Sequence, residues 1–508
     1  MKKRLIPLLL ALALLLTACG IESSTTGTTG TTGTTGISCS QHTDNDNNGT
    51  CDDCTANLII PVKFYAINDL HGKLVDGTNH IGVDELTSFW RNEQAEGDVV
   101  LLSTGDMWQG SSESNLTQGK IIMDWMNDLD FAAMTLGNHE FDWGEDAISS
   151  NAQVAEFPIL AINIYDRDTN ERVDYCDAST VVDLGEVQIG IIGAMGDCYS
   201  SIASDKTEGV YFKVGSELTR LVKEESQRLR TECGVDFVVY VIHDGYGSTT
   251  SSSQVNRPGS YYSTELSNGY VDLVFEGHTH QAYCFADEYG VYHLQNRGDN
   301  KGGVSHAQLK INYVTGSFTV DAKLIASNSY RQCEDDPIVG ELLEKYKDQI
   351  SIANRVLGTN SRYRSSEELG AMVAKLYYEL GLSHWGDQYT ITMGGGSLST
   401  RSPYNLKAGE VKYGDLQSLF PFDNEIRLCA IKGKELKRCF LRWDNYYAIG
   451  EGGALKEADI DDNAIYYVVL DTWTSNYDAI DLTIVEYYTP GIYARDLLAE
   501  FIASGGLA

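Results

Sequence analysis

Five apolar segments of this chain end in polar side chains, and this pattern constrains the fold more than any other feature of the sequence. The segments are residues 62–69, 98–106, 131–138, 236–244 and 271–280, and each contains an apolar run of strand length. Longer polar or amphipathic segments, with room for helices, separate most of them. Near-continuous apolar strands that alternate with helices predict an α/β fold in which the sheet is covered on both faces.

The polar side chains at these strand ends are of the types that bind divalent cations. They are Asp69, His71, Asp106, Asn138, His139, His243, His278 and His280. Because open α/β sheets place their sites at the carboxyl ends of strands, we expect these side chains to lie close together. Carboxylate, imidazole and amide ligands without thiolate favour Zn²⁺, Mn²⁺, Co²⁺, Fe or Mg²⁺. Loops are generally polar, so one such strand end is weak evidence, but five in succession indicate a metal site.

The five motifs resemble those of the calcineurin-like metallophosphoesterases, whose pattern is D-x-H, G-D, G-N-H-[DE], H and G-H-x-H. The resemblance runs from about Lys63 to about Ile325. It implies a four-layer β-sandwich flanked by helices over residues 60–330, with two divalent metal ions. By this resemblance, Asp69, His71, Asp106 and His280 hold one metal, and Asp106, Asn138, His243 and His278 hold the other. Asp106 is therefore expected to bridge both ions.

The resemblance also implies a reaction. Two cations roughly 3.5 to 4 Å apart polarise a phosphoryl group and acidify a water, so that hydroxide attacks at neutral pH. His139 directly follows a metal ligand, so we expect it to reach the phosphate and donate a hydrogen bond or a proton. Asp142, three residues further on, is expected to orient this imidazole.

The second half of the chain has its own pattern. Residues 331–357 are predicted to connect two domains, with a helix at 338–350, and a further helix is expected at 365–381. Residues 358–508 resemble the C-terminal domain of the bacterial 5'-nucleotidase family, whose members join it to the same metal domain. This resemblance implies a second, smaller α/β domain that binds the substrate.

The same resemblance implies the substrate contacts. Phe422 and Tyr477 are expected to hold a nucleobase between them, although a buried core position is the alternative for Phe422. The other expected substrate contacts are Asn424, Arg401, Gly395 and Gly396. The chain departs from the family pattern at Leu398, where an arginine is common, and after Tyr477, where "DAIDLT" replaces a glycine-rich segment.

The N-terminal segment "MKKRLIPLLLALALLLTACG" resembles a bacterial lipoprotein signal. Its apolar run is shorter than the roughly 20 residues that a membrane span needs. We expect removal of residues 1–18 and attachment of lipid to Cys19. Residues 19–38 repeat Thr and Gly and predict a flexible tether. The chain is thus expected to be exported and anchored to the membrane at its extracytoplasmic face.

Residues 39–54, "CSQHTDNDNNGTCDDC", form a short module with three interpretations. Asp44, Asp46, Asn48 and Asp52 follow the start of a calcium-binding loop, although Thr55 stands where an EF-hand has its closing Glu. Cys39, His42, Cys51 and Cys54 have the paired spacing of a zinc site. Disulfide pairing is the third interpretation, which export would favour. Of the three, we favour calcium.

The formal net charge of −34 disfavours a nucleic-acid polymer as a partner. Small phosphorylated substrates remain compatible with it, because bound cations reverse the field locally. The expected function is an extracellular two-metal phosphohydrolase, acting as a monomer, that removes phosphate from nucleotides. The alternatives are a 2',3'-cyclic-nucleotide phosphodiesterase, a nucleotide-sugar pyrophosphatase, or a surface protein that binds metal or nucleotide without turnover. The complete ligand set argues against the last of these.

Overall fold

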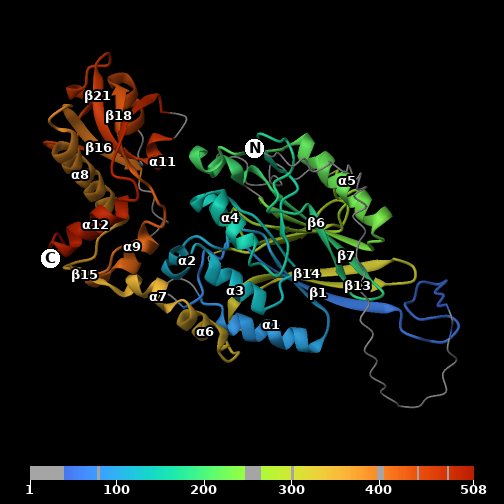
Figure 1. The fold of residues 1–508 in the computed structure, drawn as a ribbon. Coiled ribbons are helices and arrows are strands. Elements are labelled where there is room, and N and C mark those ends of the chain that lie inside the picture. Colours follow the sequence, from blue (N-terminus) through green and yellow to red (C-terminus); the bar gives the residue numbers. More distant parts are fainter. Residues whose placement is uncertain are drawn as a thin grey trace, which may run out of the picture.

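The computed structural model describes residues 39, 41–76, 81–245, 265–298, 303–397, 405–442, 446–476 and 480–507. The predicted signal and tether, including Cys19, lie outside the described residues, as do Arg401 and Tyr477. Within the described ranges, no helix combines the length and the apolar character needed to cross a membrane. Figure 1 shows two folded parts, drawn in blue to yellow and in orange to red, with helices α6 and α7 between them.

The first part contains two six-stranded sheets. One has the strand order β14-β13-β1-β2-β3-β4, in which β1 to β4 are parallel and β13 and β14 are antiparallel neighbours. Its strands are β1 (Ile59–Ile67), β2 (Val99–Ser103), β3 (Ala133–Thr135), β4 (Ile159–Leu160), β13 (Val304–Asn312) and β14 (Phe318–Ile325). The other has the order β11-β12-β10-β9-β7-β6. Its strands are β6 (Ser179–Asp183), β7 (Gln188–Met195), β9 (Phe237–His243), β10 (Leu273–Glu276), β11 (Tyr283–Ala286) and β12 (Tyr292–Gln295).

The two sheets pack face to face through a core built by alternate residues of their strands. Val62, Phe64 and Ala66 of β1 point into this core, where they belong to one cluster with Val239 and Phe275 of the other sheet. Side chains of opposite parity in the same strands, such as Tyr65, face the outer layers. Because successive strand residues point to opposite faces, near-continuous apolar strands supply both cores.

Helices cover the outer face of each sheet. The outer helices of the first sheet are α1 (Asp84–Glu96), α3 (Lys120–Asp128), α4 (Glu145–Ala152) and α6 (Ile338–Lys345). The second sheet is covered by α5 (Ser216–Glu232), which buries Leu218, Val222 and Leu229 on one face. This spacing makes an apolar stripe on an otherwise polar helix. The result is the four-layer α/β arrangement that the sequence predicted.

The connecting segment differs from the single helix predicted at 338–350. The structure has two helices, α6 and the short α7 (Lys347–Ile350), which are separated at Tyr346. The hydroxyl of Tyr346 donates a hydrogen bond to Asp124 Oδ2 of α3 at 2.7 Å. Tyr346 thereby ties the connecting segment to the first part of the molecule.

The second part is built on a third six-stranded sheet with the order β20-β19-β16-β21-β18-β22. Its strands are β16 (Ile391–Ser397), β18 (Ile426–Lys432), β19 (Tyr446–Gly450), β20 (Gly453–Ala454), β21 (Ile465–Asp471) and β22 (Leu482–Tyr487). Helix α8 (Ser366–Trp385) packs on this sheet, and a β15 (Val356–Asn360) and β17 (Gly409–Lys412) ribbon lies with α9 (Tyr413–Leu419) and α12 (Ala494–Ala503). Ser365 caps α8 by accepting a hydrogen bond from the backbone N–H of Glu368, which explains where the predicted helix begins.

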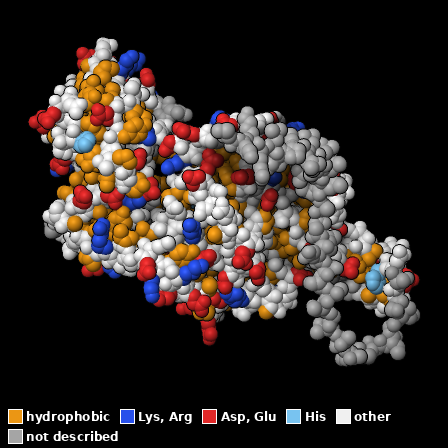
Figure 2. All heavy atoms as spheres, viewed as in Figure 1, with side chains coloured by type: hydrophobic (Ala, Val, Ile, Leu, Met, Phe, Trp, Pro, Cys, Tyr) orange, Lys and Arg blue, Asp and Glu red, His pale blue; other side chains and the backbone are white. Residues whose placement is uncertain are grey.

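Acidic side chains are spread over both parts on the face seen in Figure 2, with basic side chains between them. This distribution agrees with the net charge of −34. Attraction for a phosphorylated molecule must therefore come from local groups rather than from the field of the whole protein.

Candidate active site

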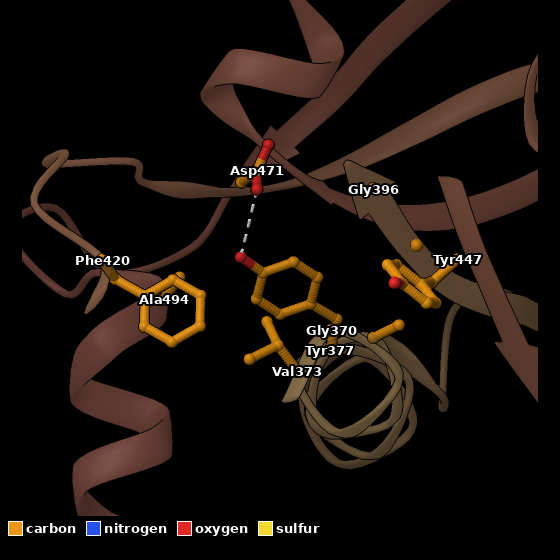
Figure 3. Close-up of a pocket in the computed structure, with 10 residues that line it drawn as sticks. Gly370, Val373, Tyr377, Gly396, Phe420, Tyr447, Asp471 and Ala494 are labelled. Carbon is orange, nitrogen blue, oxygen red and sulfur yellow. Dashed lines mark hydrogen bonds between the residues drawn. The ribbon is translucent and has the colours of Figure 1, made fainter. Parts of the chain in front are cut away.

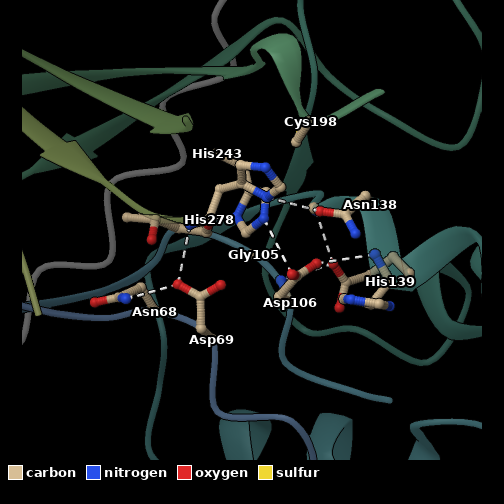
Figure 4. A network of polar contacts seen from close by, with 12 residues as sticks. Asn68, Asp69, Gly105, Asp106, Asn138, His139, Cys198, His243 and His278 are labelled. Atoms are coloured by element: carbon tan, nitrogen blue, oxygen red, sulfur yellow. Dashed lines mark hydrogen bonds and ion pairs between the residues drawn. The ribbon is translucent and has the colours of Figure 1, made fainter. Parts of the chain in front are cut away.

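The predicted ligands come from strands of both sheets of the first part. Asp69, Asp106 and Asn138 follow β1, β2 and β3 of one sheet, whereas His243 ends β9 and His278 follows β10 of the other. The carboxyl ends of these strands meet at the same edge of the sandwich, and Figure 4 shows the side chains pointing toward one another. The sequence-predicted metal ligands thus lie together in space.

The first group of candidate ligands is Asp69, His71 and His280, whose ligand atoms all lie within 4.8 Å of one another. His280 Nε2 lies 3.1 Å from Asp69 Oδ1 and 3.3 Å from His71 Nε2. Asp69 and His71 are fully buried. Two imidazole nitrogens and a carboxylate oxygen that face one point are an arrangement suited to a cation.

The second group is Asp106, His243 and His278, which satisfy the same 4.8 Å criterion. His243 Nε2 lies 3.2 Å from Asp106 Oδ2, and His278 Nδ1 lies 3.0 Å from Asn138 Oδ1. In Figure 4 Asp106 is drawn between Asp69 and His139. Its position is compatible with the predicted bridging role.

Two buried atoms in these groups support the fit of metal ions. Asp69 Oδ1 and His243 Nε2 are inaccessible to solvent and make no hydrogen bond among the described residues, although they face the candidate ligand atoms His280 Nε2 at 3.1 Å and Asp106 Oδ2 at 3.2 Å. A buried polar atom without a partner is costly, and most are satisfied in native proteins. A divalent cation would satisfy both atoms, and the carboxylate and imidazole donors match the metals predicted from the sequence.

Backbone carbonyl groups orient two of these imidazoles. His71 Nδ1 lies 3.0 Å from the carbonyl oxygen of Gln109, and His243 Nδ1 lies 2.6 Å from that of Thr104. A ring N–H donated to a backbone carbonyl leaves Nε2 with its lone pair directed to the centre.

The backbone is strained at the same residues. Asp69, His71, Asp106, His278 and His280 all have positive φ values, between 51° and 71°. Side chains other than glycine rarely adopt this left-handed conformation, which costs free energy that the surrounding structure must supply. Strain at five ligands indicates that the strand ends are shaped for positioning these side chains.

Glu140 is a site residue that the sequence analysis did not single out. Its buried carboxylate accepts hydrogen bonds from the backbone N–H groups of Gly137, Asp106, Met107 and Trp108 at 2.7 to 3.2 Å. Burial and the charge of Asp106 raise the pKa of Glu140 to about 7, against the opposing effect of these N–H groups. Glu140 therefore positions the loop that carries Asp106. The sequence signal that could have identified Glu140 is its place as the acidic fourth residue of the G-N-H-[DE] motif.

The charges of the ligands depend strongly on one another. Burial raises the pKa of Asp106, but His243 and His139 outweigh it and hold this pKa well below its usual range. Burial lowers the pKa of His243, yet Asp106 and Asp69 outweigh it and raise the pKa to about 10. Burial and the charge of His243 lower the pKa of His278 to about 4. A cation would compete with the proton on His243, so metal affinity is expected to rise with pH.

His139 lies beside the metal ligands and contacts Asp142. His139 Nδ1 is 2.8 Å from Asp142 Oδ2. The ring of His139 lies 5.3 Å from the ring of His71 and 5.8 Å from the ring of Phe422. His139 is thus placed between the candidate metal centre and the second domain.

A cleft of about 360 Å³ lies between the two domains at this point. Its lining residues include Asn138, His139, Asp142, Asp205, Lys206, His278, Phe422, Asp423, Asn424, Thr472 and Trp473. Two predicted substrate contacts, Phe422 and Asn424, therefore face the cleft. Trp473, 37% exposed, is an aromatic lining residue that the sequence analysis did not identify. Arg495 holds the backbone of Phe422 in place by donating a hydrogen bond to its carbonyl oxygen at 3.1 Å.

The two predicted glycine contacts lie elsewhere. Gly395 and Gly396 line a small cavity inside the second domain, shown in Figure 3, together with Tyr377 and Asp471. The Tyr377 hydroxyl donates a hydrogen bond to Asp471 Oδ2 at 3.4 Å in this cavity. Neither glycine is part of the lining of the interdomain cleft. The predicted contacts Arg401 and Tyr477 are outside the described residues.

The four-layer fold and the clustered carboxylates and imidazoles define the first domain as a calcineurin-like phosphoesterase. The model of that family matches residues 62–282, and the model of the 5'-nucleotidase C-terminal domain matches residues 349–458. The chain therefore belongs to the 5'-nucleotidase family of metallophosphoesterases and is a phosphoric ester hydrolase.

Known proteins resemble the chain over most of its length. It is 25% identical to a 5'-nucleotidase of Vibrio vulnificus over 402 residues, covering 70% of this chain and 69% of that protein. It is 23% identical to protein UshA of Yersinia enterocolitica over 526 residues, covering 87% of this chain and 91% of that protein. A 5'-nucleotidase precursor from Thermus thermophilus has the same fold, with a TM-score of 0.66 and 18% identity, over 88% of this chain and 96% of that one.

Proposed function

We propose that this protein is an exported, lipid-anchored 5'-nucleotidase that uses two divalent metal ions to remove phosphate from nucleotides. The observation that carries the proposal is the position of His139. Its ring lies beside that of His71, its backbone N–H donates to Asp106 Oδ1 at 2.9 Å, and it lines the interdomain cleft with Phe422. One molecule with a phosphate at one end and an aromatic base at the other suits this arrangement. The names of relatives such as the Vibrio vulnificus 5'-nucleotidase support the same substrate class.

The metal ligands are assigned by their grouping. Asp69, His71 and His280 would hold one ion, and His243, His278 and Asn138 the other, with Asp106 shared. When bound, the two ions would polarise the phosphoryl group and acidify the attacking water.

The protein's own groups act on the phosphate. Asp142 accepts a hydrogen bond from His139 Nδ1, which fixes the ring and leaves Nε2 for the substrate. A protonated His139 donates through Nε2 to a phosphate oxygen as negative charge develops there. Lys206, which also lines the cleft, adds positive charge to an otherwise acidic molecule.

The second domain supplies the contacts to the base. Phe422 stacks on one face of the base, and Asn424 offers an amide within the same cleft. Tyr477 is the proposed second aromatic, with Arg401 as a further contact, and Trp473 already lies in the cleft wall. Stacking on aromatic faces tolerates any base, so we expect a broad nucleotide range.

A substrate panel tests this function. The purified chain with Mn²⁺ is assayed on AMP and other mononucleotides, on 2',3'-cyclic AMP, on UDP-glucose and on p-nitrophenyl phosphate. We expect the highest kcat/KM for 5'-mononucleotides. A higher value for the cyclic nucleotide or for the nucleotide sugar would replace the proposal by the corresponding phosphodiesterase or pyrophosphatase. Membrane fractionation of Cys19→Ser tests the anchor separately, because this variant should be released from the membrane.

A further inference from the structure

The N-terminal module, residues 39–54, packs on the catalytic domain at a distance from the active site. Asn47 Oδ1 accepts hydrogen bonds from Thr315 Oγ1 at 2.9 Å and Ser317 Oγ at 2.6 Å, in the turn between β13 and β14. Asn312, the last residue of β13 before this turn, lies opposite Ile59 at the start of β1. The active-site ligand Asp69 follows the other end of β1. The module and the catalytic groups therefore lie at opposite ends of the same sheet (Figure 1).

Four side chains of this module converge on one point. The ligand atoms of Cys39, His42, Cys51 and Cys54 all lie within 4.8 Å of one another, and Cys51 is 1% exposed. Cys39 Sγ is 3.7 Å from Cys51 Sγ, and Cys54 Sγ is 3.5 Å from His42 Nδ1. Around a tetrahedral zinc ion with its usual bond lengths, two sulfurs lie about 3.8 Å apart, and a sulfur and a nitrogen about 3.5 Å apart. Both separations agree with the edges of such a tetrahedron.

The same geometry does not fit a disulfide. A disulfide needs an S–S distance of about 2.05 Å, far below the 3.7 Å between Cys39 and Cys51. Cys39, Cys51 and Cys54 are all free thiols in the structure.

The acidic side chains of the module accept hydrogen bonds from its own backbone. Asp44 accepts hydrogen bonds from the backbone N–H groups of Asn48 at 3.0 Å and Gly49 at 2.9 Å. Asp52 Oδ2 accepts from the backbone N–H of Asn45 at 2.9 Å. Asp46 likewise accepts from the backbone N–H and the side-chain amide of Asn48. The carboxylates of Asp44, Asp46 and Asp52 lie near one another, but each accepts hydrogen bonds from amide groups. They shape the loop that joins His42 to Cys51.

Gly49 completes this loop. Its φ is +82°, and an added Cβ would lie 2.7 Å from Ile59 Cγ1. Only glycine combines this left-handed conformation with close packing on the start of β1. The loop therefore places Cys51 and Cys54 beside Cys39 and His42 while it rests on the catalytic domain.

We propose that Cys39, His42, Cys51 and Cys54 bind a structural zinc ion that holds the N-terminal module in the shape in which it packs on the catalytic domain. Three thiolates and one imidazole fill a tetrahedral coordination shell, which leaves no position for substrate and marks a structural site. Binding releases the thiol protons and joins Cys39, at the start of the described chain, to residues that pack on β1 and β13.

Cobalt substitution tests the proposal on the whole chain. The protein is purified with reductant, stripped with a chelator and reconstituted with Co²⁺. We expect a thiolate-to-cobalt charge-transfer absorption in the near ultraviolet, which carboxylates and imidazoles of the active site cannot produce. The variant with Cys51→Ser and Cys54→Ser should lack this band, whereas Cys333→Ser, a matched change in another partly buried cysteine, should keep it. The same band in the double variant, or no band in the wild type, would overturn the proposal.

Zinc content and proteolysis complete the test. The wild type should carry one more zinc ion per chain than the double variant, with kcat on AMP unchanged within about twofold because the two sites are distant. The double variant should also be cleaved faster near its N-terminus. If peptide mapping of chain purified without reductant finds a disulfide within the module and no extra zinc, the proposal fails. Protection of the double variant by Ca²⁺, lost again in Asp46→Asn, would replace zinc by calcium.

Discussion

The imidazole of His139 and the phenyl ring of Phe422 lie 5.8 Å apart, with 31° between their planes, although they belong to different domains. His139 follows the strand β3 of the catalytic domain, and Phe422 precedes β18 of the second domain. Phe422 of the second domain therefore lies beside the imidazole that we propose contacts the phosphate. In the proposed function, the two domains share one substrate site.

Replacing Phe422 by Ala should separate base recognition from phosphate chemistry. Stacking on a base contributes roughly 1 to 3 kcal/mol, so kcat/KM for AMP should fall by about tenfold or more. Hydrolysis of p-nitrophenyl phosphate, which lacks a nucleobase, should be nearly unchanged. Tyr363→Ala, at an exposed aromatic away from the cleft, serves as the control. Equal losses on both substrates would point to misfolding, and no loss on AMP would refute the stacking role.

His139→Asn should lose turnover but keep metal. The imidazole contacts Asp142 and the cleft and is not grouped with the metal ligands, so its removal leaves both ligand sets complete. We expect kcat to fall by roughly 100-fold or more, the usual effect of removing a general acid. Metal analysis should give the wild-type stoichiometry. A near-normal kcat would exclude the proposed role, and loss of metal would make His139 a ligand.

The clustering of the candidate metal ligands could be predicted from the sequence because each stands at the end of an apolar strand or within four residues of it. Residues within one strand-end motif, such as Asp69 and His71, are placed by local chain geometry. The residues alone did not show that Asp106 and His243 come from different sheets. That arrangement depends on packing between the two sheets, which no single strand-end motif encodes.

Contacts that depend on distant parts of the chain were not predicted. Glu140 accepts hydrogen bonds from backbone N–H groups more than 30 residues upstream, and the motif that marks this residue does not show these partners. Trp473 follows β21 and lines the cleft because this end of the strand lies at the interface with the first domain. Tyr346, at which the predicted helix is interrupted, donates a hydrogen bond to Asp124 in another helix.

Glu140→Gln should destabilise the catalytic domain and weaken metal binding. An amide offers one acceptor oxygen, and its NH₂ group would face the backbone N–H groups that the carboxylate now accepts. Leaving buried donors without partners costs about 1 to 3 kcal/mol each, so the thermal midpoint should fall clearly. Glu232→Gln, at an exposed glutamate at the end of α5, is the matched control. Wild-type stability and metal content in Glu140→Gln would contradict the positioning role.

His293 should make the stability of the catalytic domain depend on pH. It is buried, with Nδ1 3.3 Å from Glu276 Oε1 and Nε2 3.5 Å from Asp287 Oδ2. Burial lowers the pKa of His293, but these two carboxylates outweigh it and raise the pKa above its usual value.

The sign of the pH effect follows from this direction. A raised pKa in the folded state stabilises the fold fully below the unfolded value of about 6.5, and this contribution is lost as pH rises through the folded pKa. The thermal midpoint of the wild type should therefore exceed that of His293→Gln most at about pH 6, and the difference should shrink toward alkaline pH. Saturating Mn²⁺ keeps metal occupancy equal, and His384→Gln, an exposed histidine of α8, controls for the loss of one imidazole. If the gap between the wild type and His293→Gln stays constant or widens as pH rises, the two carboxylates do not hold a proton on His293.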